Sequence, residues 1–523
     1  MRILVRCDSS ELIGSGHLIR CRSLSRALKE RGAEIIFLTR AHSGNHINQI
    51  EKEFRTLKMK YLKNRIDKKN INDYRTWLLC SEEEDAEETF KLIKENNICE
   101  FDLLIIDHYS LSYVWQDRLN YLLHKSYNRK IKFLVIDDIC NRQFHADILI
   151  NQNFYGSNSS NPYEYLFHKP NLELIGPHYS ILDKEYSNQK SNQKRILYKN
   201  ILVYFGGSDN FGIYKRIIEI LSNQEFYKFN IDIILPKNLK EKEIIIQRIK
   251  RRKNINYHSN LPSMHNIILK SDICIGAGGT NTWERLLLGL DSLVITLTEN
   301  QKLNIKNLHK ENYLFHLGHI DKIENISLRN FIKKKLTQKN RFQESKFLID
   351  GLGTKRICSA IYYSKSQIEM RKIVLSDKYI LWRWANDKTV RERSFNKKFI
   401  SILDHMDWIK KGLHNKKRLH LIAFDSFECP IGQVRFDKFE NDKLIEIDIS
   451  IEKVFRCNGY GSLILKESIN FLKKEWGSEL IINAKILNDN LASQKLFIKN
   501  DFTINDKSSN SNEFSIYTLN LKT

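Results

Sequence analysis

The sequence predicts an α/β protein in which two doubly wound domains are followed by a smaller α+β domain. Short apolar runs alternate with helical patterns through the first two thirds of the chain, and consecutive strands followed by helices replace that rhythm afterwards. A chain of 523 residues is also too long for one ordinary core. We expect domains at residues 1–185, 198–365 and 370–520.

Four apolar runs in the first domain are typical of buried parallel strands. They are RILVRC (2–7), EIIFLT (34–39), FDLLIID (101–107) and IKFLVIDD (131–138). Between the first two runs, Leu18, Cys21, Leu24 and Leu28 recur at helical spacing. This alternation of strand and helix predicts a doubly wound sheet.

The polar stretch 183–200 has no apolar periodicity and marks the first domain boundary. A second series of predicted strands follows at 200–209, 229–236, 271–279 and 291–297. Two such domains in tandem form a cleft between the carboxyl ends of their strands, where nucleotides commonly bind.

The third domain has a different order of elements. A basic helical stretch at 328–366 leads to it, and the predicted strands 419–424, 430–439 and 443–452 then run consecutively. Helices follow these strands, which indicates an α+β domain.

Composition excludes several classes of protein. The hydrophobic content of 41% and charged content of 28% fit a soluble globular protein, and no apolar run approaches the roughly 18–20 residues of a membrane span. MRILVRCDSS at the start predicts a strand and not a signal peptide. The nine cysteines are scattered without a CxxC pair, which argues against a disulfide framework and a zinc site and favours the cytoplasm.

The net charge of +23 is spread along the whole chain and has no accompanying helix-turn-helix or zinc-finger pattern. We therefore expect neither a nucleic-acid nor a membrane partner. A basic surface of this kind attracts small polyanions such as nucleotides.

The segment SDICIGAGGTNTWERLLLGL (271–290) predicts a strand, a glycine turn and a helix that begins near Thr280. Gly278 and Gly279 would let a diphosphate approach the backbone, where the unpaired amides of the helix start bind phosphate. Glu284, one turn into the helix, is placed to accept hydrogen bonds from both ribose hydroxyls.

A similar turn containing Gly206 and Gly207 follows the first strand of the same domain. Each turn alone has a structural alternative, in which glycine only permits a tight bend. Two such turns at strand ends of one domain favour a ligand.

The stretch IGSGHLIRCR (13–22) places a histidine in the first strand-to-helix turn. Gly14 and Gly16 shape the turn, but GSGHLI lacks the third glycine of a dinucleotide motif. His17 either caps or packs the helix or, facing the cleft, accepts a proton from water near neutral pH. The nearby polar residues that can orient it are Arg6, Asp8 and Arg20.

The third domain carries R-x-x-G-x-G between a strand and an amphipathic helix, in RCNGYGSLILKESINFL (456–472). Gly459 and Gly461 free the backbone to wrap a pyrophosphate and Arg456 adds a charge, although such glycines can also serve a turn alone. The segment NDNLASQKLFIKNDF (488–502) follows about thirty residues later.

The predicted strand IEIDIS (445–450) precedes that loop. Period-two alternation places Glu446 and Asp448 on one face and the isoleucines on the other. Either acid can take a proton from an ammonium through water. The alternative is an acidic edge that faces solvent.

Six segments of the first 350 residues together resemble the UDP-2,4-diacetamido-2,4,6-trideoxy-β-L-altropyranose hydrolases of pseudaminic acid biosynthesis. They are DSSELIGSGHLIRCRSLSRAL (8–28), IIDHYSL (105–111), VIDDICNRQFHADILINQN (135–153), ELIGPHYSIL (173–182), YFGGSD (204–209) and GAGGTNTWERLLLGL (276–290). The resemblance implies a GT-B-like pair of domains that cleaves the anomeric C–O bond with inversion and releases UDP without a metal.

By the same resemblance, His17 matches the catalytic histidine, as the base or water-orienting group. Gly278, Gly279, Thr280 and Glu284 match the UDP-binding turn and helix. Asn300 of TENQ (298–301) matches a segment near the sugar.

The two glycine and asparagine motifs of the third domain resemble the GCN5-related N-acetyltransferase (GNAT) family over about 371–505, which implies acetyl-CoA as co-substrate. The residues that match its pyrophosphate loop are Arg456, Asn458, Gly459, Tyr460 and Gly461, and those that match its pantetheine contacts are Asn490 and Ser493. Phe497 stands where many members have a tyrosine acid, and Asp501-Phe502 replaces the usual Gly-Phe.

Both resemblances point to one pathway, in which a UDP-4-amino sugar is N-acetylated and the product is then hydrolysed from UDP. The sequence thus predicts a bifunctional enzyme that acts on UDP-sugars and acetyl-CoA. One alternative is a GT-B glycosyltransferase with a sugar acceptor and an acetyltransferase domain acting on a related diamino sugar. Another is a binding protein for nucleotide sugars or nucleic acid whose catalytic residues are idle.

Overall fold

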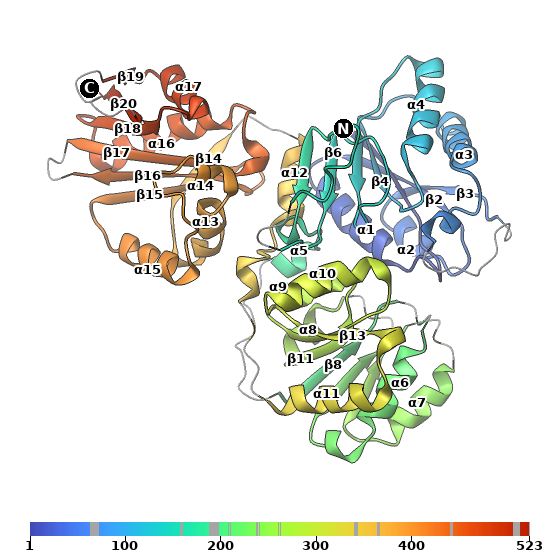
Figure 1. The fold of residues 1–523 in the computed structure, drawn as a ribbon. Helices are drawn as coiled ribbons and strands as arrows, with labels where there is room; N and C mark the ends of the chain where they lie inside the picture. Colours follow the sequence, from blue (N-terminus) through green and yellow to red (C-terminus); the bar gives the residue numbers. More distant parts are fainter. Residues whose placement is uncertain are drawn as a thin grey trace. The chain divides into compact units, whose positions relative to one another are not determined.

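The computed structural model of the chain describes residues 1–62, 73–156, 160–187, 198–207, 209, 211–236, 239, 241–259, 261, 263–338, 342, 344–362, 367–439, 443–505 and 513–521. These residues form two compact units, Met1–Thr354 and Lys355–Thr523. The first unit holds two parallel sheets and the second a mixed sheet (Figure 1), so the predicted fold class is confirmed. Residues 188–197 of the predicted linker lie outside the described residues.

The first sheet has seven parallel strands in the order β3-β2-β1-β4-β5-β6-β7. The strands are β1 (Arg2–Cys7), β2 (Glu34–Arg40), β3 (Arg55–Met59), β4 (Leu103–Asp107), β5 (Phe133–Ile136), β6 (Ile148–Asn151) and β7 (Leu172–Ile175). The strand order reverses between β1 and β4, which pair in parallel with Cys7 opposite Asp107. In sheets of this kind, ligands bind beyond the carboxyl ends of the strands at that reversal.

Helices cover the first sheet. They are α1 (Gly16–Lys29), α2 (Ile47–Glu51), α3 (Glu82–Glu95) and α4 (Tyr113–Tyr127), with a short 3-10 turn at Tyr74–Trp77. The short helix α5 (Lys184–Ser187) instead contributes Tyr186 to an apolar cluster of the second sheet. Leu4 and Leu104 of the strands and Trp115 of α4 belong to one buried apolar cluster. Helices α3 and α4 lie side by side over it (Figure 1).

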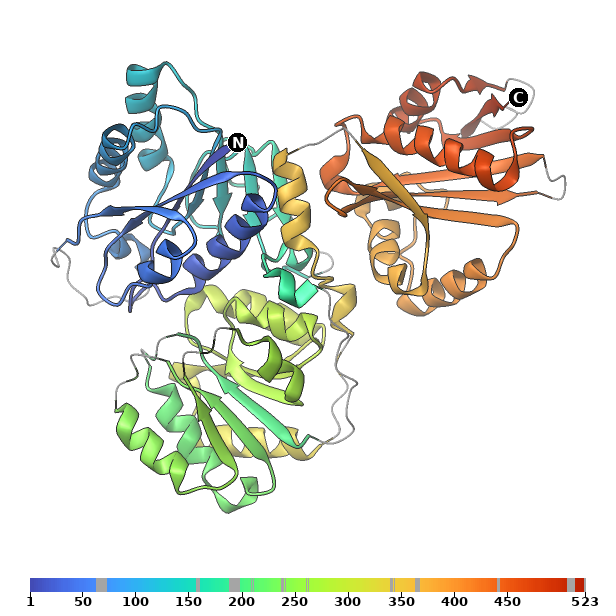
Figure 2. The same cartoon turned by 180° about the vertical axis from the view of Figure 1, so that it is seen from behind.

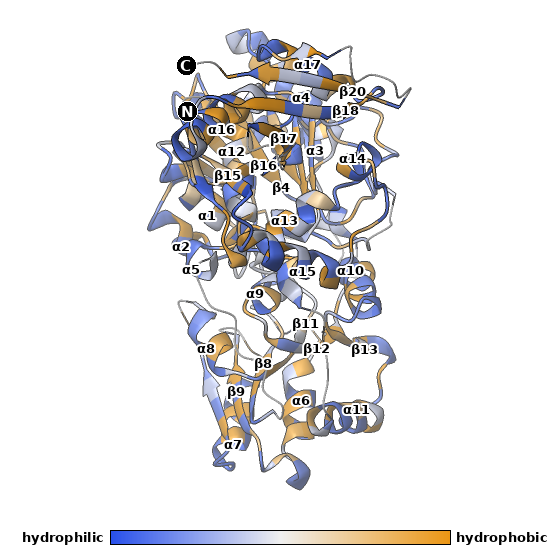
Figure 3. Cartoon of the chain, turned by 90° about the vertical axis from the view of Figure 1, so that its left-hand side faces the viewer, coloured by the Kyte–Doolittle hydropathy of each residue, from blue (hydrophilic) through white to orange (hydrophobic). Residues whose placement is uncertain are grey.

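The second sheet has six parallel strands in the order β10-β9-β8-β11-β12-β13, with its own reversal between β8 and β11. The strands are β8 (Asn200–Tyr204), β9 (Asn230–Ile234), β10 (Ile255–His258), β11 (Ile273–Ala277), β12 (Asp291–Thr296) and β13 (Phe315–His319). In Figure 3 much of the central strand β8 is orange, and its Ile201, Leu202 and Val203 are buried, as expected of a strand covered on both faces.

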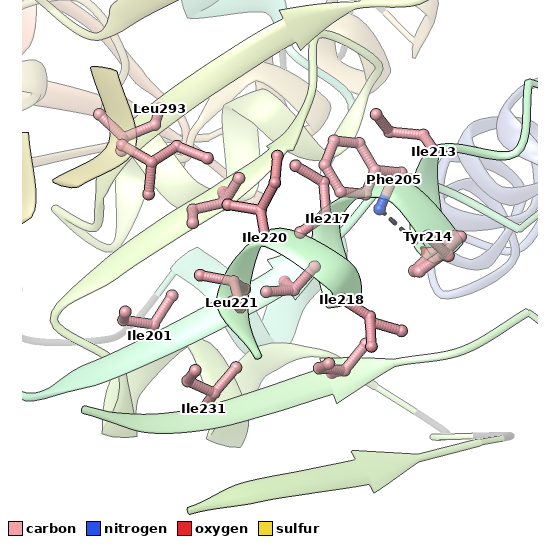
Figure 4. Packing of buried hydrophobic residues seen from close by; sticks show 14 of the residues in the cluster. Ile201, Phe205, Ile213, Tyr214, Ile217, Ile218, Ile220, Leu221, Ile231 and Leu293 are labelled. Atoms are coloured by element: carbon pink, nitrogen blue, oxygen red, sulfur yellow. Dashed lines mark hydrogen bonds between the residues drawn. The ribbon is translucent and has the colours of Figure 1, made fainter. Parts of the chain in front are cut away.

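Two apolar layers sandwich the second sheet. On one face Ile201 and Ile231 of the strands pack against Ile217 and Leu221 of α6 (Figure 4), and on the other Leu202 packs with residues of α9 and α10. The helices are α6 (Ile213–Leu221), α7 (Lys242–Lys250), α8 (His265–Lys270), α9 (Asn281–Leu287), α10 (Glu299–Lys310) and α11 (Asn325–Thr337). Helix α12 (Gly353–Tyr362) contains the boundary between the two units.

The second unit is built on a mixed sheet in the order β14-β15-β16-β17-β18-β20-β19. The strands are β14 (Ile368–Lys372), β15 (Arg418–Asp425), β16 (Pro430–Lys438), β17 (Leu444–Ile451), β18 (Ile481–Leu487), β19 (Thr503–Ile504) and β20 (Phe514–Asn520). Strands β17 and β18 run parallel and pair only from Leu444–Ile481 to Glu446–Asn483. Beyond Glu446 the two strands separate, which opens the sheet at that point.

Both faces of the mixed sheet are covered. The helices are α13 (Lys378–Ala385), α14 (Lys388–Glu392), α15 (Ile402–Leu413), α16 (Tyr460–Trp476) and α17 (Leu491–Lys499). Ile422 of β15 packs with Trp384 of α13 and Ile409 of α15. Helix α16, orange-red in Figure 2, lies along the opposite face.

Candidate active sites

His17 lies at the strand-order reversal of the first sheet, in the turn between β1 and α1. Gly14 adopts a φ of +79°, which favours glycine, and its N–H donates to the carbonyl of Ser10. Helix α1 begins at Gly16, so His17 belongs to its first turn, and the residue is 7% exposed.

Asp107 at the end of β4 holds His17. The Nδ1 of His17 lies 2.6 Å from Oδ1 of Asp107, and Arg20 donates to the same carboxylate through Nε and Nη2, each at 2.6 Å. Burial raises the pKa of Asp107, but the charges of Arg20 and then His17 outweigh it and hold the pKa below its ordinary range. An ionised Asp107 can only accept a hydrogen bond, so Nδ1 of His17 donates, and in the neutral imidazole Nε2 is the nitrogen that has the lone pair.

Aromatic rings surround the imidazole of His17. Its ring centroid lies 4.5 Å from that of Tyr109 and 5.8 Å from that of Trp77, both edge to face. Tyr109 donates to Asp138 at 2.7 Å, and Arg20 also binds Asp138. The sequence reasoning missed Asp107 and Asp138 as site residues, although each ends a predicted strand and therefore had to lie at the sheet edge beside His17.

Arg6 and Asp8 belong to a different network. Both are completely buried, and Arg6 pairs with Asp8 at 2.5 Å and with Asp85 at 3.0 Å. Asp8 also lies 3.2 Å from Nε2 of His108. Their described ion pairs do not include His17, so Arg20 is the predicted neighbour that reaches it.

The turn that carries His17 meets both glycine turns of the second sheet. A Cβ on Gly16 would lie 3.7 Å from Oγ1 of Thr280, and a Cβ on Gly207 would lie 2.8 Å from Oγ of Ser15. Gly206 has a φ of +106° and open space where a side chain would be. The turn that carries His17 thus lies beside Thr280 and Gly207 of the second sheet's turns.

The two glycines after β11 have different reasons to be glycine. A Cβ on Gly278 would lie 2.5 Å from Cγ1 of Ile305 in α10, so packing within the protein explains that residue. A Cβ on Gly279 would meet nothing within 4 Å. Only Gly279 therefore borders space that a ligand could occupy. Helix α9 begins at Asn281, with Thr280 as its N-cap, as predicted.

Glu284 lies in α9 and is half-buried. Burial raises the pKa of its carboxyl to about 7, and the charge of Asp183 adds to the rise. A pKa raised in this way means that the protein supplies too few hydrogen bonds and positive charges to stabilise the ionised carboxylate. Hydroxyl donors from a ligand would stabilise its ionised form.

Asn300 lies in the first turn of α10, where its side-chain oxygen accepts from Oγ1 of Thr298 at 2.5 Å. Burial raises the pKa of the Tyr74 hydroxyl, and the backbone N–H of Asn300 offsets part of that rise. Because Tyr74 packs 5.2 Å from Tyr109, Asn300 borders the aromatic group around His17.

In the second unit, Gly459 has a φ of +85° and forms the N-cap of α16. Tyr460 is buried against Phe455, so its side chain fixes the loop from inside. A Cβ on Gly461 would lie 3.0 Å from Ile451 and 3.1 Å from Leu496, which leaves little room for a side chain. A loop of this form at the start of a 17-residue helix directs its amides outward, as a pyrophosphate requires.

Two further predicted contacts have partners within the protein. Arg456 pairs with Asp387 at 2.9 Å and donates to the carbonyl of Ile451, and the side chain of Asn458 donates to the carbonyl of Arg456. Arg456 thus sets the shape of the loop.

Asn490 caps α17. Its side-chain oxygen accepts from the N–H of Ser493 at 3.3 Å and from Arg393 at 2.9 Å. Only the amide nitrogen of Asn490 is left for the pantetheine contact that the resemblance implies.

The alternation predicted for β17 is present, with Ile445 and Ile447 buried and Asp448 exposed. Glu446 pairs with Lys485 at 2.8 Å, whereas the closest approach of Asp448 to Arg435 is 3.5 Å. Asp448 lies beyond the last residue pair of β17 and β18, in the part of the strand that faces the opening.

Phe497 is buried against Phe502, so its ring is part of the hydrophobic core.

Within the part of the chain that the structure describes, no group of three His, Cys, Asp or Glu side chains is arranged to hold a metal ion. None of the described helices is both long and apolar enough to cross a membrane.

Two family models match the chain. Residues 367–503 match an acetyltransferase (GNAT) domain, and residues 182–361 match a protein of unknown function (DUF354). The mixed sheet is GNAT-like. The first unit contains two Rossmann-like parallel sheets.

The chain is similar over its whole length to an uncharacterized protein of Methanocaldococcus jannaschii, at 26% identity over 542 residues and 100% of both chains. It is also 26% identical over 313 residues to the UDP-2,4-diacetamido-2,4,6-trideoxy-beta-L-altropyranose hydrolase of Campylobacter jejuni, over 60% of this chain and 98% of that protein. Among solved structures, spermidine N-acetyltransferase from Vibrio cholerae in complex with CoA and spermine matches at 13% identity, over 30% of this chain and 97% of its own, with a TM-score of 0.28.

Proposed function

We propose that the chain is a bifunctional nucleotide-sugar enzyme of pseudaminic acid biosynthesis. Its first unit hydrolyses UDP-2,4-diacetamido-2,4,6-trideoxy-β-L-altropyranose to the free sugar and UDP, with inversion at the anomeric carbon. Its second unit N-acetylates the preceding UDP-4-amino sugar with acetyl-CoA. Distant similarity to a hydrolase of that name and the GNAT domain match support the two halves.

The observation that carries the hydrolase proposal is the Asp107–His17 pair at the strand-order reversal. With Nδ1 donating to Asp107, Nε2 of His17 is the nitrogen that accepts a proton from water. The water oxygen forms a bond to the anomeric carbon as the bond from that carbon to the diphosphate oxygen breaks, and UDP leaves with the electron pair. UDP is a good leaving group, so a second carboxylate of the glycosidase kind is not needed.

The second sheet supplies the UDP site in this proposal. Gly279 leaves space for the diphosphate beside the turn, and Gly206 leaves space at the neighbouring turn. Glu284 would accept hydrogen bonds from the ribose hydroxyls. Thr280 and Asn300 lie between this site and the turn of His17, and Gly278 maintains the packing beneath it.

The second unit supplies the acetyl transfer. The loop from Arg456 to Gly461 would bind the pyrophosphate of acetyl-CoA, which supplies the acetyl group as a thioester. Asp448 would accept the proton of the acceptor ammonium, so that the amine forms the new C–N bond as the C–S bond breaks. The acylated nitrogen then loses its second proton to water, and the CoA thiolate takes a proton from water, since Phe497 cannot donate one.

A GT-B glycosyltransferase with a sugar acceptor is the second candidate, because the same fold and UDP site would serve it. The distinguishing experiment incubates the chain with UDP-2,4-diacetamido-2,4,6-trideoxy-β-L-altropyranose and no acceptor. We expect UDP release, an α-configured free sugar in the first NMR spectra, and loss of both with His17→Ala. No UDP release until a sugar acceptor is added would support the glycosyltransferase instead.

A further inference from the structure

The segment Asp387–Phe399, here called the acceptor segment, includes α14 and borders the opening between β17 and β18. Asp387 pairs with Arg456 of the glycine loop, and Arg393 donates to Asn490 at the start of α17. Phe395 packs edge to face on Phe514 of β20, with ring centroids 5.5 Å apart. Side chains of this one segment therefore contact the glycine loop, the start of α17 and the start of β20.

Arg391 connects the acceptor segment to the proposed base. Burial lowers the pKa of Arg391, and the carboxylate of Asp448 partly offsets that lowering, so the two charges lie near each other. The Nε–H of Arg391 is buried and has no hydrogen-bond acceptor among the described residues. An amine that reaches Asp448 thus brings the rest of its molecule onto the acceptor segment.

The acceptor segment is strongly basic. It contains five cationic residues and two acidic ones, and Asp387 is already paired with Arg456. The cations are Lys388, Arg391, Arg393, Lys397 and Lys398. A surface of this charge attracts anionic acceptors and repels polyamines.

Exposed aromatic rings accompany these charges. Phe395 is 55% exposed and Phe399 is 65% exposed, although each ring also packs on an aromatic neighbour. Phe395, Asn396, Lys397 and Lys398 line an open hollow. Exposed aromatic rings beside cations are typical of nucleotide-binding sites, because the base stacks on a ring and the phosphates pair with the cations.

We propose that the acceptor segment binds the nucleoside diphosphate of the acceptor, with Phe395 stacking on the base and Lys397 and Lys398 pairing with the phosphates. The inference rests on the proposed function and deepens it, because it makes the second unit selective for amino sugars that are still attached to UDP. The amine then lies toward Asp448.

Acetyl-CoA also carries a diphosphate and a base, so the same surface chemistry could serve the co-substrate. Steady-state kinetics distinguish a site for the acceptor from a site for acetyl-CoA. If the acceptor segment binds the acceptor, changes in it raise the KM for the UDP-4-amino sugar and leave the KM for acetyl-CoA unchanged. The reverse pattern would overturn the proposal.

The test measures thiol release by the full chain with UDP-4-amino-4,6-dideoxy-N-acetyl-β-L-altrosamine as acceptor. For Lys397→Glu/Lys398→Glu we expect the acceptor KM to rise roughly tenfold or more, because two favourable charge contacts become repulsive. Phe395→Ala should raise the same KM severalfold. The matched control is Lys473→Glu/Lys474→Glu, an exposed lysine pair in the last turn of α16, which should leave both KM values unchanged.

A separate binding measurement keeps the inference testable if the proposed acceptor is not acetylated at all. Calorimetry with UDP is performed on Glu284→Ala, in which the proposed UDP site of the first unit is weakened. Binding of UDP to Glu284→Ala that disappears on adding Lys397→Glu and Lys398→Glu supports the acceptor segment as a nucleotide site. A UDP stoichiometry and affinity that are the same in Glu284→Ala and in the triple variant overturn it, because Lys397 and Lys398 would then contribute to no UDP site.

Discussion

Asp107 determines which nitrogen of His17 can act. Its carboxylate accepts three short hydrogen bonds, from His17 Nδ1 and from two nitrogens of Arg20, all at 2.6 Å, and a longer one from the Cys21 thiol at 3.4 Å. The carboxylate is completely buried, so solvent does not compete for these hydrogen bonds. His17 therefore has a fixed orientation before any substrate binds, which is the condition for general base catalysis.

Asp107→Asn should lower kcat for UDP release by about 10²-fold or more, because the neutral amide neither fixes the tautomer nor stabilises the imidazolium. The KM for the UDP-sugar should change little, since Asp107 is buried. Steady-state kinetics with circular dichroism as a folding check measure this. Asp117→Asn is the matched control, because Asp117 pairs with His145 on the exposed surface. An unchanged kcat in Asp107→Asn would contradict the role of Asp107.

Glu284 predicts how UDP binding depends on pH. With its pKa raised to about 7 in the free protein, the carboxyl is largely protonated at pH 6 and ionised at pH 8. Because ribose hydroxyls stabilise the ionised form, UDP affinity should rise severalfold between these pH values. Calorimetry at several pH values measures the change.

The terminal phosphate of UDP also loses a proton in this range, as phosphate monoesters do near pH 6. Glu284→Gln retains that contribution and removes the carboxyl, so it is the proper control. An identical pH dependence in Glu284→Gln and the unaltered chain would contradict the contact with the ribose.

Sequence reasoning selected His17, Gly279 and Glu284 as candidates because each follows a strong apolar strand, either in the connection to the next helix or in the first turns of that helix. It did not predict that Arg6 pairs with Asp85 or that Arg456 pairs with Asp387, since those partners are distant in sequence. Gly278 shows the same limit, because the Ile305 side chain that excludes a Cβ comes from another helix.

At the scale of elements, a glycine within β11 and a glycine in the turn after it separate an effect on stability from an effect on binding. Gly276→Ala should destabilise the first unit by about 1–3 kcal/mol, because its Cβ would lie 2.4 Å from the carbonyl oxygen of Tyr204. Gly279→Ala should leave Tm nearly unchanged and weaken UDP binding roughly tenfold, because its Cβ would enter the space proposed for the diphosphate. Thermal unfolding and calorimetry on both variants test this, and unchanged UDP affinity in Gly279→Ala would exclude a diphosphate there.

The separation of β17 and β18 distinguishes the two candidate bases. Asp448→Asn should lower kcat for thiol release about 10²-fold, whereas Glu446→Gln should have a smaller effect because Glu446 lies at the last strand pair and is held by Lys485. Thiol release at saturating acetyl-CoA measures both. Equal activity of Asp448→Asn and the unaltered chain would leave the acidic edge as a solvent-facing feature.

The strands that the sequence did not predict in the first unit are mostly edge strands. β3, β7, β10 and β13 lie at the edges of their sheets, and three of them, β3 (RTLKM), β10 (INYH) and β13 (FHLGH), have only alternating or sparse apolar residues. Central strands such as β1 and β11 are buried on both faces and are apolar throughout most of their length. A sequence therefore identifies the centre of a parallel sheet more readily than its edges.

At the scale of the whole molecule, the proposed function assigns two different reactions to the two units of one chain. The first unit would consume the N-acetylated UDP-sugar that the second unit makes. Because the order of the two reactions is a property of the chain as a whole, it is tested on the full chain with one starting compound.

The starting compound is UDP-4-amino-4,6-dideoxy-N-acetyl-β-L-altrosamine. The amounts of UDP and of free thiol released by the full chain are measured with and without acetyl-CoA. We predict that UDP appears only when acetyl-CoA is supplied and that thiol appears in matching amount. UDP release without acetyl-CoA would contradict the order of the reactions. Neither product in the presence of acetyl-CoA would contradict the proposed pathway.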